Sequence, residues 1–213
     1  MLKTPVRFPF LAISAVGVLL TLNACDAPPA PVEEAVVQAT VAPEQFSAEA
    51  FFTTTSVGLP GSAAYAFSPD GSQILMSSDA SGVFNVYAQP VAGGAPAPLT
   101  ASTSNAMFAV SYFPADERVL YTFDEGGDEL NHVFVREIDG SVRDLTPGDA
   151  LKAGFLGWSD DGESFYLITT ERNEQDFDVW RYAADDYERE MIFENPGFQI
   201  SAISEDGRWL ALD

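Results

Sequence analysis

Reactive and cationic side chains are scarce in this sequence. It holds one cysteine, Cys25, one histidine, His132, and 10 Lys and Arg residues against 32 Asp and Glu, for a formal net charge of −22. A single cysteine excludes an internal disulfide. The acidic balance argues against nucleic acid as a partner, because the phosphate backbone carries the same sign of charge. A Gly-x-Ser-x-Gly motif is also lacking, and with it the strained turn that exposes a nucleophilic serine.

A continuous apolar run occurs near the start of the chain. Lys3 and Arg7 precede residues 8–21, which are uncharged, mostly apolar and short for a membrane span. A positively charged start followed by an apolar run of this length is typical of a secretory signal peptide. The run closes on Leu22-Asn23-Ala24-Cys25, so that a small residue lies directly before the cysteine.

This segment resembles the signal peptide and lipobox of bacterial lipoproteins. The resemblance implies cleavage after residue 24 and lipidation of Cys25, which would tie the protein to a lipid bilayer, since each buried methylene adds about 0.8 kcal/mol. The alternatives are an ordinary secretory signal with an incidental cysteine, or a buried cysteine in a core helix. The expected location is the cell envelope, lipid-anchored and facing the periplasm. Asp26 resembles the inner-membrane retention signal of enterobacteria, which other bacteria do not all share, so the choice of membrane stays open.

Three regions follow from this division of the chain. Residues 1–24 are expected to be the signal peptide. Residues 25–45 join the lipidated cysteine to a linker of Ala, Pro, Val and Glu that has no usable periodicity, so we expect an extended spacer. Residues 46–213 are expected to form the folded part, and their number suits one domain.

Four segments of the folded part share one layout. Each is an apolar strand end, a tight polar turn and a strand of large residues, at residues 66–76, 112–121, 158–167 and 203–212. Three of the turns contain Asp-Gly, with Gly71, Gly162 and Gly207 supplying the positive φ that hairpin turns require. The second turn has Asp116-Glu117 instead and departs from the pattern.

The spacing of these segments predicts the fold. Their equivalent residues Ile74, Val119, Phe165 and Leu210 are 45, 46 and 45 residues apart. A period of about 40 to 50 residues with several short strands per repeat is typical of a β-propeller. The repeats offer a third strand at residues 83–87, 132–136 and 178–182, and the first two close on Pro98-Leu99-Thr100 and Asp144-Leu145-Thr146. We therefore expect four-stranded antiparallel blades.

The predicted fold is all-β, an incomplete propeller of about three four-stranded blades plus the first strand of a fourth. The expected blades cover about residues 60–105, 106–152 and 153–198, and the truncated one covers residues 199–213. A β-sandwich is the alternative, but it would not give a near-constant period. Because blades bury their faces against neighbours, we expect the chain to continue in a longer parent or to pair with another copy.

Two groups of propeller proteins share the first turn motif, Phe67-Ser68-Pro69-Asp70-Gly71. It resembles the repeat of TolB-type propellers and of the propeller domains of prolyl oligopeptidase family (S9) serine peptidases. The second blade is more specific: residues 124–134, an acidic hairpin with two glycines, and Arg143-Asp144-Leu145-Thr146-Pro147-Gly148 are similar to S9 propellers. Residues 50–53, just before the first blade, also resemble the start of those peptidases.

The S9 resemblance implies an N-terminal propeller that gates access to a C-terminal α/β-hydrolase domain of the parent. That domain would carry the Ser, Asp and His triad, so the chain alone is not expected to be an enzyme, and no catalytic residue is assigned. We interpret His132 as the first residue of a blade strand rather than a general base. The expected partners are short peptides, the hydrolase domain and the bilayer at Cys25. No cofactor is implied.

Two groups of acidic residues in the hairpin loops resemble metal ligands in composition. Asp124-Glu125 with Asp128-Glu129, and Asp160-Asp161 with Glu163, have oxygens that calcium prefers, but their spacing is not that of an EF-hand, so we predict solvated turns and no metal. Trp158, Trp180 and Trp209 are expected to pack within blades.

The alternative function is a non-catalytic TolB-like propeller lipoprotein that binds proteins in the cell envelope.

Overall fold

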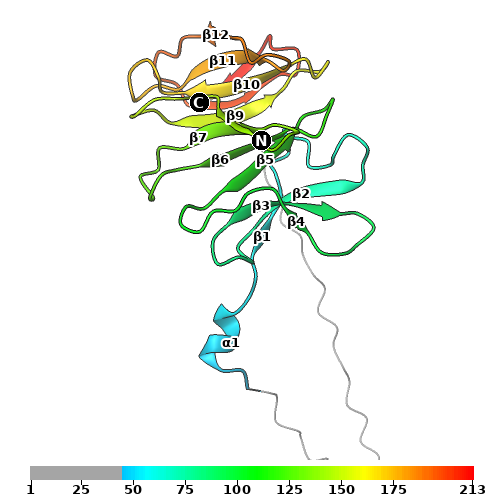
Figure 1. The fold of residues 1–213 in the computed structure, drawn as a ribbon. Helices are drawn as coiled ribbons and strands as arrows, with labels where there is room; N and C mark the ends of the chain where they lie inside the picture. Colours follow the sequence, from blue (N-terminus) through cyan, green and yellow to red (C-terminus); the bar gives the residue numbers. More distant parts are fainter. Residues whose placement is uncertain (1–44) are drawn as a thin grey trace, which may run out of the picture. The chain divides into compact units, whose positions relative to one another are not determined.

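Short antiparallel strands dominate residues 45–213, the part of the chain that the computed structural model describes (Figure 1). The expectations for residues 1–24, for the linker up to residue 44 and for Cys25 lie outside these described residues. A short helix, α1 (Ala48–Phe52), precedes the strands and begins at Ser47, whose side chain accepts a hydrogen bond from the Ala50 N–H. Within residues 45–213, no helix is long and apolar enough to cross a membrane.

The strands form three sheets of four and one of two. Within each sheet, neighbouring strands are consecutive in the chain and antiparallel. The first blade holds β1 (Val57–Gly58), β2 (Gln73–Ser78), β3 (Asn85–Pro90) and β4 (Ala97–Pro98). The second holds β5 (Phe108–Tyr112), β6 (Val119–Phe123), β7 (His132–Arg136) and β8 (Val142–Asp144). The third holds β9 (Ala153–Trp158), β10 (Ser164–Thr169), β11 (Asp178–Ala183) and β12 (Arg189–Phe193). The prediction of an all-β chain of four-stranded blades is confirmed.

The fourth unit differs from the expectation in one detail. The sequence predicted a single strand, but the structure has two, β13 (Ile200–Ile203) and β14 (Leu210–Leu212). The turn at Gly207 pairs them, with Ile203 opposite Leu210 and Ile200 opposite Leu212. The pattern predicts only a strand end before the turn, whereas hydrogen bonding across the turn makes these apolar residues a full partner strand.

The Asp-Gly turns have a common construction. Gly71, Gly162 and Gly207 have φ of 71°, 70° and 68°, as the sequence predicted. In the third turn, the Ser159 hydroxyl donates to Asp161 Oδ1 at 2.7 Å, and the Glu163 N–H donates to the same oxygen at 2.9 Å. The first and fourth turns repeat both bonds. Hydrogen bonds to the ionised carboxylate lower the pKa of Asp161, first from the serine hydroxyl and then from the backbone.

The second turn replaces glycine with an arginine bridge to the next blade. No residue of this turn has a positive φ. Arg118 instead forms hydrogen bonds from Nε to both carboxylate oxygens of Asp116, and its Nη1 donates to the Ala184 carbonyl and the Tyr187 hydroxyl, each at 2.7 Å. The guanidinium also lies over the Phe113 ring, 4.1 Å from its centroid. The turn that departs from the sequence pattern therefore joins blade two to blade three.

Two apolar clusters hold the blades face to face. Leu75 and Val86 of the first blade meet Tyr112, Val119 and Tyr121 of the second. A larger cluster joins the second and third blades and is made of Phe113, Leu120, Val133, Val135, Leu145, Leu151, Ala153, Trp158, Phe165, Leu167, Tyr182 and Tyr187. Since side chains alternate between the two faces of a strand, the second blade contributes one set of residues to the first blade and another set to the third. The stack of sheets in Figure 1 follows from this alternation.

Candidate functional site

The first strand of each sheet is the edge strand at one side of its blade, and three of these strands carry a bulge. In β5, β9 and β13 one extra residue interrupts the pairing with the next strand, at Val110, Leu156 and Ser201. The first strands of the second, third and fourth units therefore share this bulge. Since bulges re-aim side chains and bend a strand, they are features of the repeat rather than local defects. In propellers, the first strands of the blades surround the central channel.

The first blade departs from this rule. Gly58 pairs with Ser77 and Phe67 pairs with Ile74, so residues 59–66 lie opposite only two residues of β2, Leu75 and Met76. At the corresponding place, the second blade sets residues 109–111 opposite Leu120 and Tyr121. We call residues 59–66 the inner loop. It is a much longer insertion at the position where the other blades have a single bulged residue.

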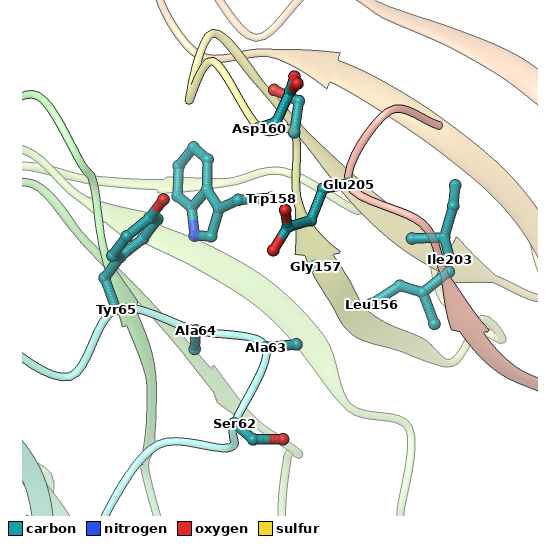
Figure 2. A pocket seen from close by; sticks show the side chains of 11 residues that line it. Ser62, Ala63, Ala64, Tyr65, Leu156, Gly157, Trp158, Asp160, Ile203 and Glu205 are labelled. Carbon is teal, nitrogen blue, oxygen red and sulfur yellow. The ribbon is translucent and has the colours of Figure 1, made fainter. Parts of the chain in front are cut away.

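The inner loop forms one wall of a pocket of about 290 Å³. Figure 2 shows residues 62–65 of the loop on one side and β9 with part of the fourth unit on the other. The lining residues come from three blades and are Ser62, Ala63, Ala64, Tyr65, Leu156, Gly157, Trp158, Ser159, Asp160, Ile203 and Glu205. A Cβ built on Gly157 would lie 3.9 Å from the Ala63 Cβ and 3.9 Å from Ile203 Cγ2, so the strand approaches the loop at van der Waals distance.

Ser111 fixes the loop and the third blade to the second. Its hydroxyl oxygen is fully buried and accepts hydrogen bonds from the Tyr65 N–H and from Trp158 Nε1, both at 2.9 Å. The same hydroxyl donates to the Tyr112 carbonyl at 2.6 Å. The Tyr112 N–H in turn donates to the Tyr65 carbonyl at 2.8 Å. One hydroxyl therefore joins three blades through two residues of the pocket lining, Tyr65 and Trp158, a role that nothing in the sequence pattern indicated.

The chemistry of the pocket suits binding or exclusion rather than catalysis. Its titratable side chains are Tyr65, Asp160 and Glu205, and its lining contains no histidine, cysteine or lysine. The Ser159 hydroxyl donates a hydrogen bond to Asp161 Oδ1 and accepts one from the Ser164 N–H, so it is engaged within its own turn. A nucleophile needs an adjacent base within hydrogen-bond reach, and among residues 45–213 no lining hydroxyl is hydrogen-bonded to the side chain of Asp160 or Glu205.

His132 lies in a second pocket, on blade two. It is the first residue of β7, as the sequence predicted, and its Nδ1 is 2.8 Å from Asp144 Oδ2. An imidazole held by a carboxylate forms two thirds of a triad, but the third member is a hydroxyl or thiol. The pocket lining contains Phe123, Phe134 and four carboxylates and has neither group. The strand-end interpretation of His132 therefore agrees with its surroundings.

The acidic groups of the hairpin loops act within their own turns. Asp124 accepts a hydrogen bond from the Glu129 N–H, and Asp128 accepts one from the Leu130 N–H. Asp161 is bound in the same way by the Glu163 N–H. Within residues 45–213, no group of three or more His, Cys, Asp and Glu side chains is placed to hold a metal ion.

The three tryptophans have different surroundings. Trp158 is buried in the larger cluster, and Trp180 packs against the same cluster with its indole N–H unpartnered. Trp209 is 71% exposed, so the prediction that it packs within a blade is wrong for the described chain. The physical reason is that, within residues 45–213, the fourth unit has two strands and no third strand covers this side chain.

The described chain superposes on solved propellers. It is similar to TolB from Acinetobacter baumannii, with a TM-score of 0.52 and 19% identity, over 74% of this chain and 37% of that one. The chain has the fold of a partial TolB-like β-propeller. The putative TolB from Agrobacterium tumefaciens gives a TM-score of 0.53 and 21% identity, over 72% of this chain and 56% of that one.

A prolyl endopeptidase shares the same propeller architecture. Its TM-score is 0.51 at 14% identity, over 65% of this chain and 22% of that protein. The chain thus spans well under two thirds of the length of each of these three proteins. No protein-family model matches the sequence, and no curated protein matches it. The similarity therefore establishes the propeller fold alone.

Proposed function

We propose that this chain is the N-terminal, substrate-gating propeller of a membrane-tethered S9-type serine peptidase that acts on short peptides. The catalytic α/β-hydrolase domain would lie in the remainder of the parent protein. The observation that carries the proposal is the coincidence of the propeller fold with a second blade that resembles S9 propellers at residues 124–134 and 143–148. The fold shared with a prolyl endopeptidase supports it.

The gating part of the proposal is supported by the pocket at the inner strands. Its lining has shape and hydrogen-bonding groups but no catalytic set, as expected of a propeller that admits substrates to chemistry performed elsewhere. The pocket around the His132–Asp144 pair contains no hydroxyl or thiol that could act as a nucleophile. We therefore assign the catalytic triad to the hydrolase domain and not to this pair. We accordingly assign recognition and exclusion to these residues and hydrolysis to the parent.

The second candidate is a non-catalytic, TolB-like propeller that binds proteins in the cell envelope. The similarity to two TolB structures at TM-scores of 0.52 and 0.53 favours it. It also needs no nucleophile. The two candidates share the tether and differ in what is encoded downstream of residue 213.

A serine-reactive fluorophosphonate probe separates the candidates. The full-length product of the gene is expressed, labelled with the probe and assayed on short peptides, and its reading frame is examined for Gly-x-Ser-x-Gly followed by Asp and His. The peptidase proposal expects labelling and hydrolysis that both disappear when the serine of that motif is replaced by alanine. A reading frame with propeller blades alone, and no labelling, would reject it in favour of the binding protein.

Tethering is tested separately. In bacteria fed labelled palmitate, the wild-type precursor should incorporate label and fractionate with membranes. The variant Cys25→Ser should lose the label, whereas Ser104→Ala, a change on the exposed surface, should keep it. Label incorporation by the Cys25→Ser protein would contradict the assignment of Cys25.

A further inference from the structure

The inner loop occupies an unusual place in the repeat. The extra residues of β5, β9 and β13 are single, so those first strands keep close to their neighbours. In the first blade the extra residues leave the sheet altogether, and the loop reaches the edge of β5 at Tyr112 and approaches β9 at Gly157. The inner loop belongs to the first blade and reaches β5 and β9, the first strands of the next two blades. It therefore lies on the side of the blades where these first strands come together.

The composition of the loop fits a chain segment that crosses a narrow space. Gly61, Ser62, Ala63 and Ala64 have small side chains, and the Ala64 N–H closes a turn on the Gly61 carbonyl at 3.1 Å. Small residues let the backbone pass close to β9 and Ile203 without filling the pocket, which keeps a volume of about 290 Å³. The loop therefore narrows the space at the inner strands without sealing it.

The loop is held at both ends, by the pairing of Gly58 with Ser77 and by the backbone bonds of Tyr65. The backbone of Tyr65 bonds to Ser111 and Tyr112, whereas residues 61–63 are exposed. Segments with few buried contacts open at low free-energy cost. A loop anchored at Gly58 and Tyr65 and exposed along residues 61–63 can restrict passage in its resting position.

We propose that the inner loop sets the upper size limit for molecules that pass along the inner strands. This inference rests on the proposed gating function and names the segment that performs it. The substrates admitted would be single extended peptides of small cross-section, and helical or folded chains would be excluded. The limit comes from Ser62, Ala63 and Ala64 facing Gly157 and Ile203 across the pocket (Figure 2).

The repeat itself supplies the test variant. Deleting residues 60–64 leaves Leu59, Tyr65 and Ala66 opposite Leu75 and Met76, which is the pattern of residues 109–111 in the second blade. In the full-length protein, we expect this deletion to raise kcat/KM for long peptides relative to dipeptide substrates by about tenfold. The reason is that the deletion changes the passage of substrate along the inner strands and leaves the hydrolytic step unaltered. The control replaces residues 60–64 with five Gly and Ser residues and should keep the wild-type ratio.

A thiol-labelling arm does not depend on hydrolysis. In the 213-residue chain carrying Cys25→Ser, the only native thiol is removed and Ile203→Cys places a probe in the pocket. A small methanethiosulfonate should label this cysteine readily, and a bulky maleimide should label it slowly. When residues 60–64 are deleted, the rate of labelling by the bulky maleimide should rise about tenfold. Met191→Cys on β12, away from the pocket lining, should show no effect of the deletion.

The outcomes separate the two proposals. Absence of peptide hydrolysis by the full-length protein rejects the peptidase function, and the labelling arm then decides on the loop. Hydrolysis with an unchanged ratio for long and short peptides, together with equal labelling before and after deletion, overturns the size limit. Should the deletion variant fail to fold, Ala63→Trp serves instead, since added bulk facing Gly157 should slow labelling of Ile203→Cys.

Discussion

Equivalent glycines in the repeated turns have unequal surroundings. Gly71 and Gly162 share the same turn and nearly the same φ, 71° and 70°. A Cβ added at Gly71 would have open space, whereas one at Gly162 would lie 2.7 Å from Pro114 Cγ of the preceding blade. The third-blade turn is therefore a packing contact as well as a turn.

Alanine substitutions at these two glycines separate the two effects. Gly71→Ala should lower the free energy of unfolding by about 1 to 2 kcal/mol, the cost of a side chain in the left-handed region. Gly162→Ala should lower the free energy of unfolding by about 1 to 3 kcal/mol more than Gly71→Ala does, because the Pro114 ring cannot move aside easily. Urea unfolding of both variants measures the difference. Equal losses would show that blade two yields to the added methyl group.

Three tyrosines should control stability at alkaline pH. Burial raises the pKa of Tyr112, Tyr121 and Tyr187 to about 12 each, against about 10 in an unfolded chain. Below pH about 10 neither state loses these protons, so the stability is fully present. Between about 10 and about 12 the unfolded chain ionises first, and the free energy of unfolding falls.

The measurement is urea unfolding from pH 9 to 11.5 alongside phenolate absorbance. Tyr112→Phe should make the protein less sensitive to alkali than the wild type, because one buried phenol no longer favours the unfolded state. Complete ionisation of all tyrosines near pH 10 without any loss of structure would contradict the burial argument.

At the scale of elements, Ser111 joins strands of three different blades. Ser111→Ala leaves the Tyr65 N–H and Trp158 Nε1 without their acceptor. A buried donor left unsatisfied costs about 1 to 3 kcal/mol, and Trp158 is buried while Tyr65 can reach water. We expect a loss of about 2 kcal/mol in the free energy of unfolding and a shift in Trp fluorescence. Ser104→Ala, on the exposed surface, should change neither.

The hairpin turns and the inner strands differ in how far the sequence reveals them. Asp-Gly turns are local, because the serine, aspartate and glycine that build them lie within a few residues, so Gly71, Gly162 and Gly207 could be found by reading the chain. The bulges at Val110 and Leu156 leave no local signal. Only the pairing of β5 with β6, and of β9 with β10, shows which residue is extra.

At the scale of the whole molecule, acidic charge is the dominant feature. The formal net charge is −22 over 213 residues. Such a charge destabilises the compact state through self-repulsion, and salt screens it with a Debye length that falls from about 30 Å at 0.01 M to about 3 Å at 1 M. We expect Tm to rise by several degrees when NaCl is raised from about 10 mM to about 500 mM, the change that 1 to 2 kcal/mol produces in a chain of this size. Calorimetry at pH 7 measures it, and at pH 4, where carboxylates begin to protonate, the rise should shrink.

The sequence by itself determined the period of the repeat, the turn glycines, the four-stranded blades and the position of His132 at the start of a strand. These features depend on residues that are close together in the sequence, or on a pattern that recurs along the chain. Tertiary structure alone decided the inner loop, its pocket and the role of Ser111, whose bonds to Tyr65 and Trp158 span 46 and 47 residues. The physical reason is that a repeat brings together residues about one period apart, and which of them form a hydrogen bond depends on the packing of whole blades.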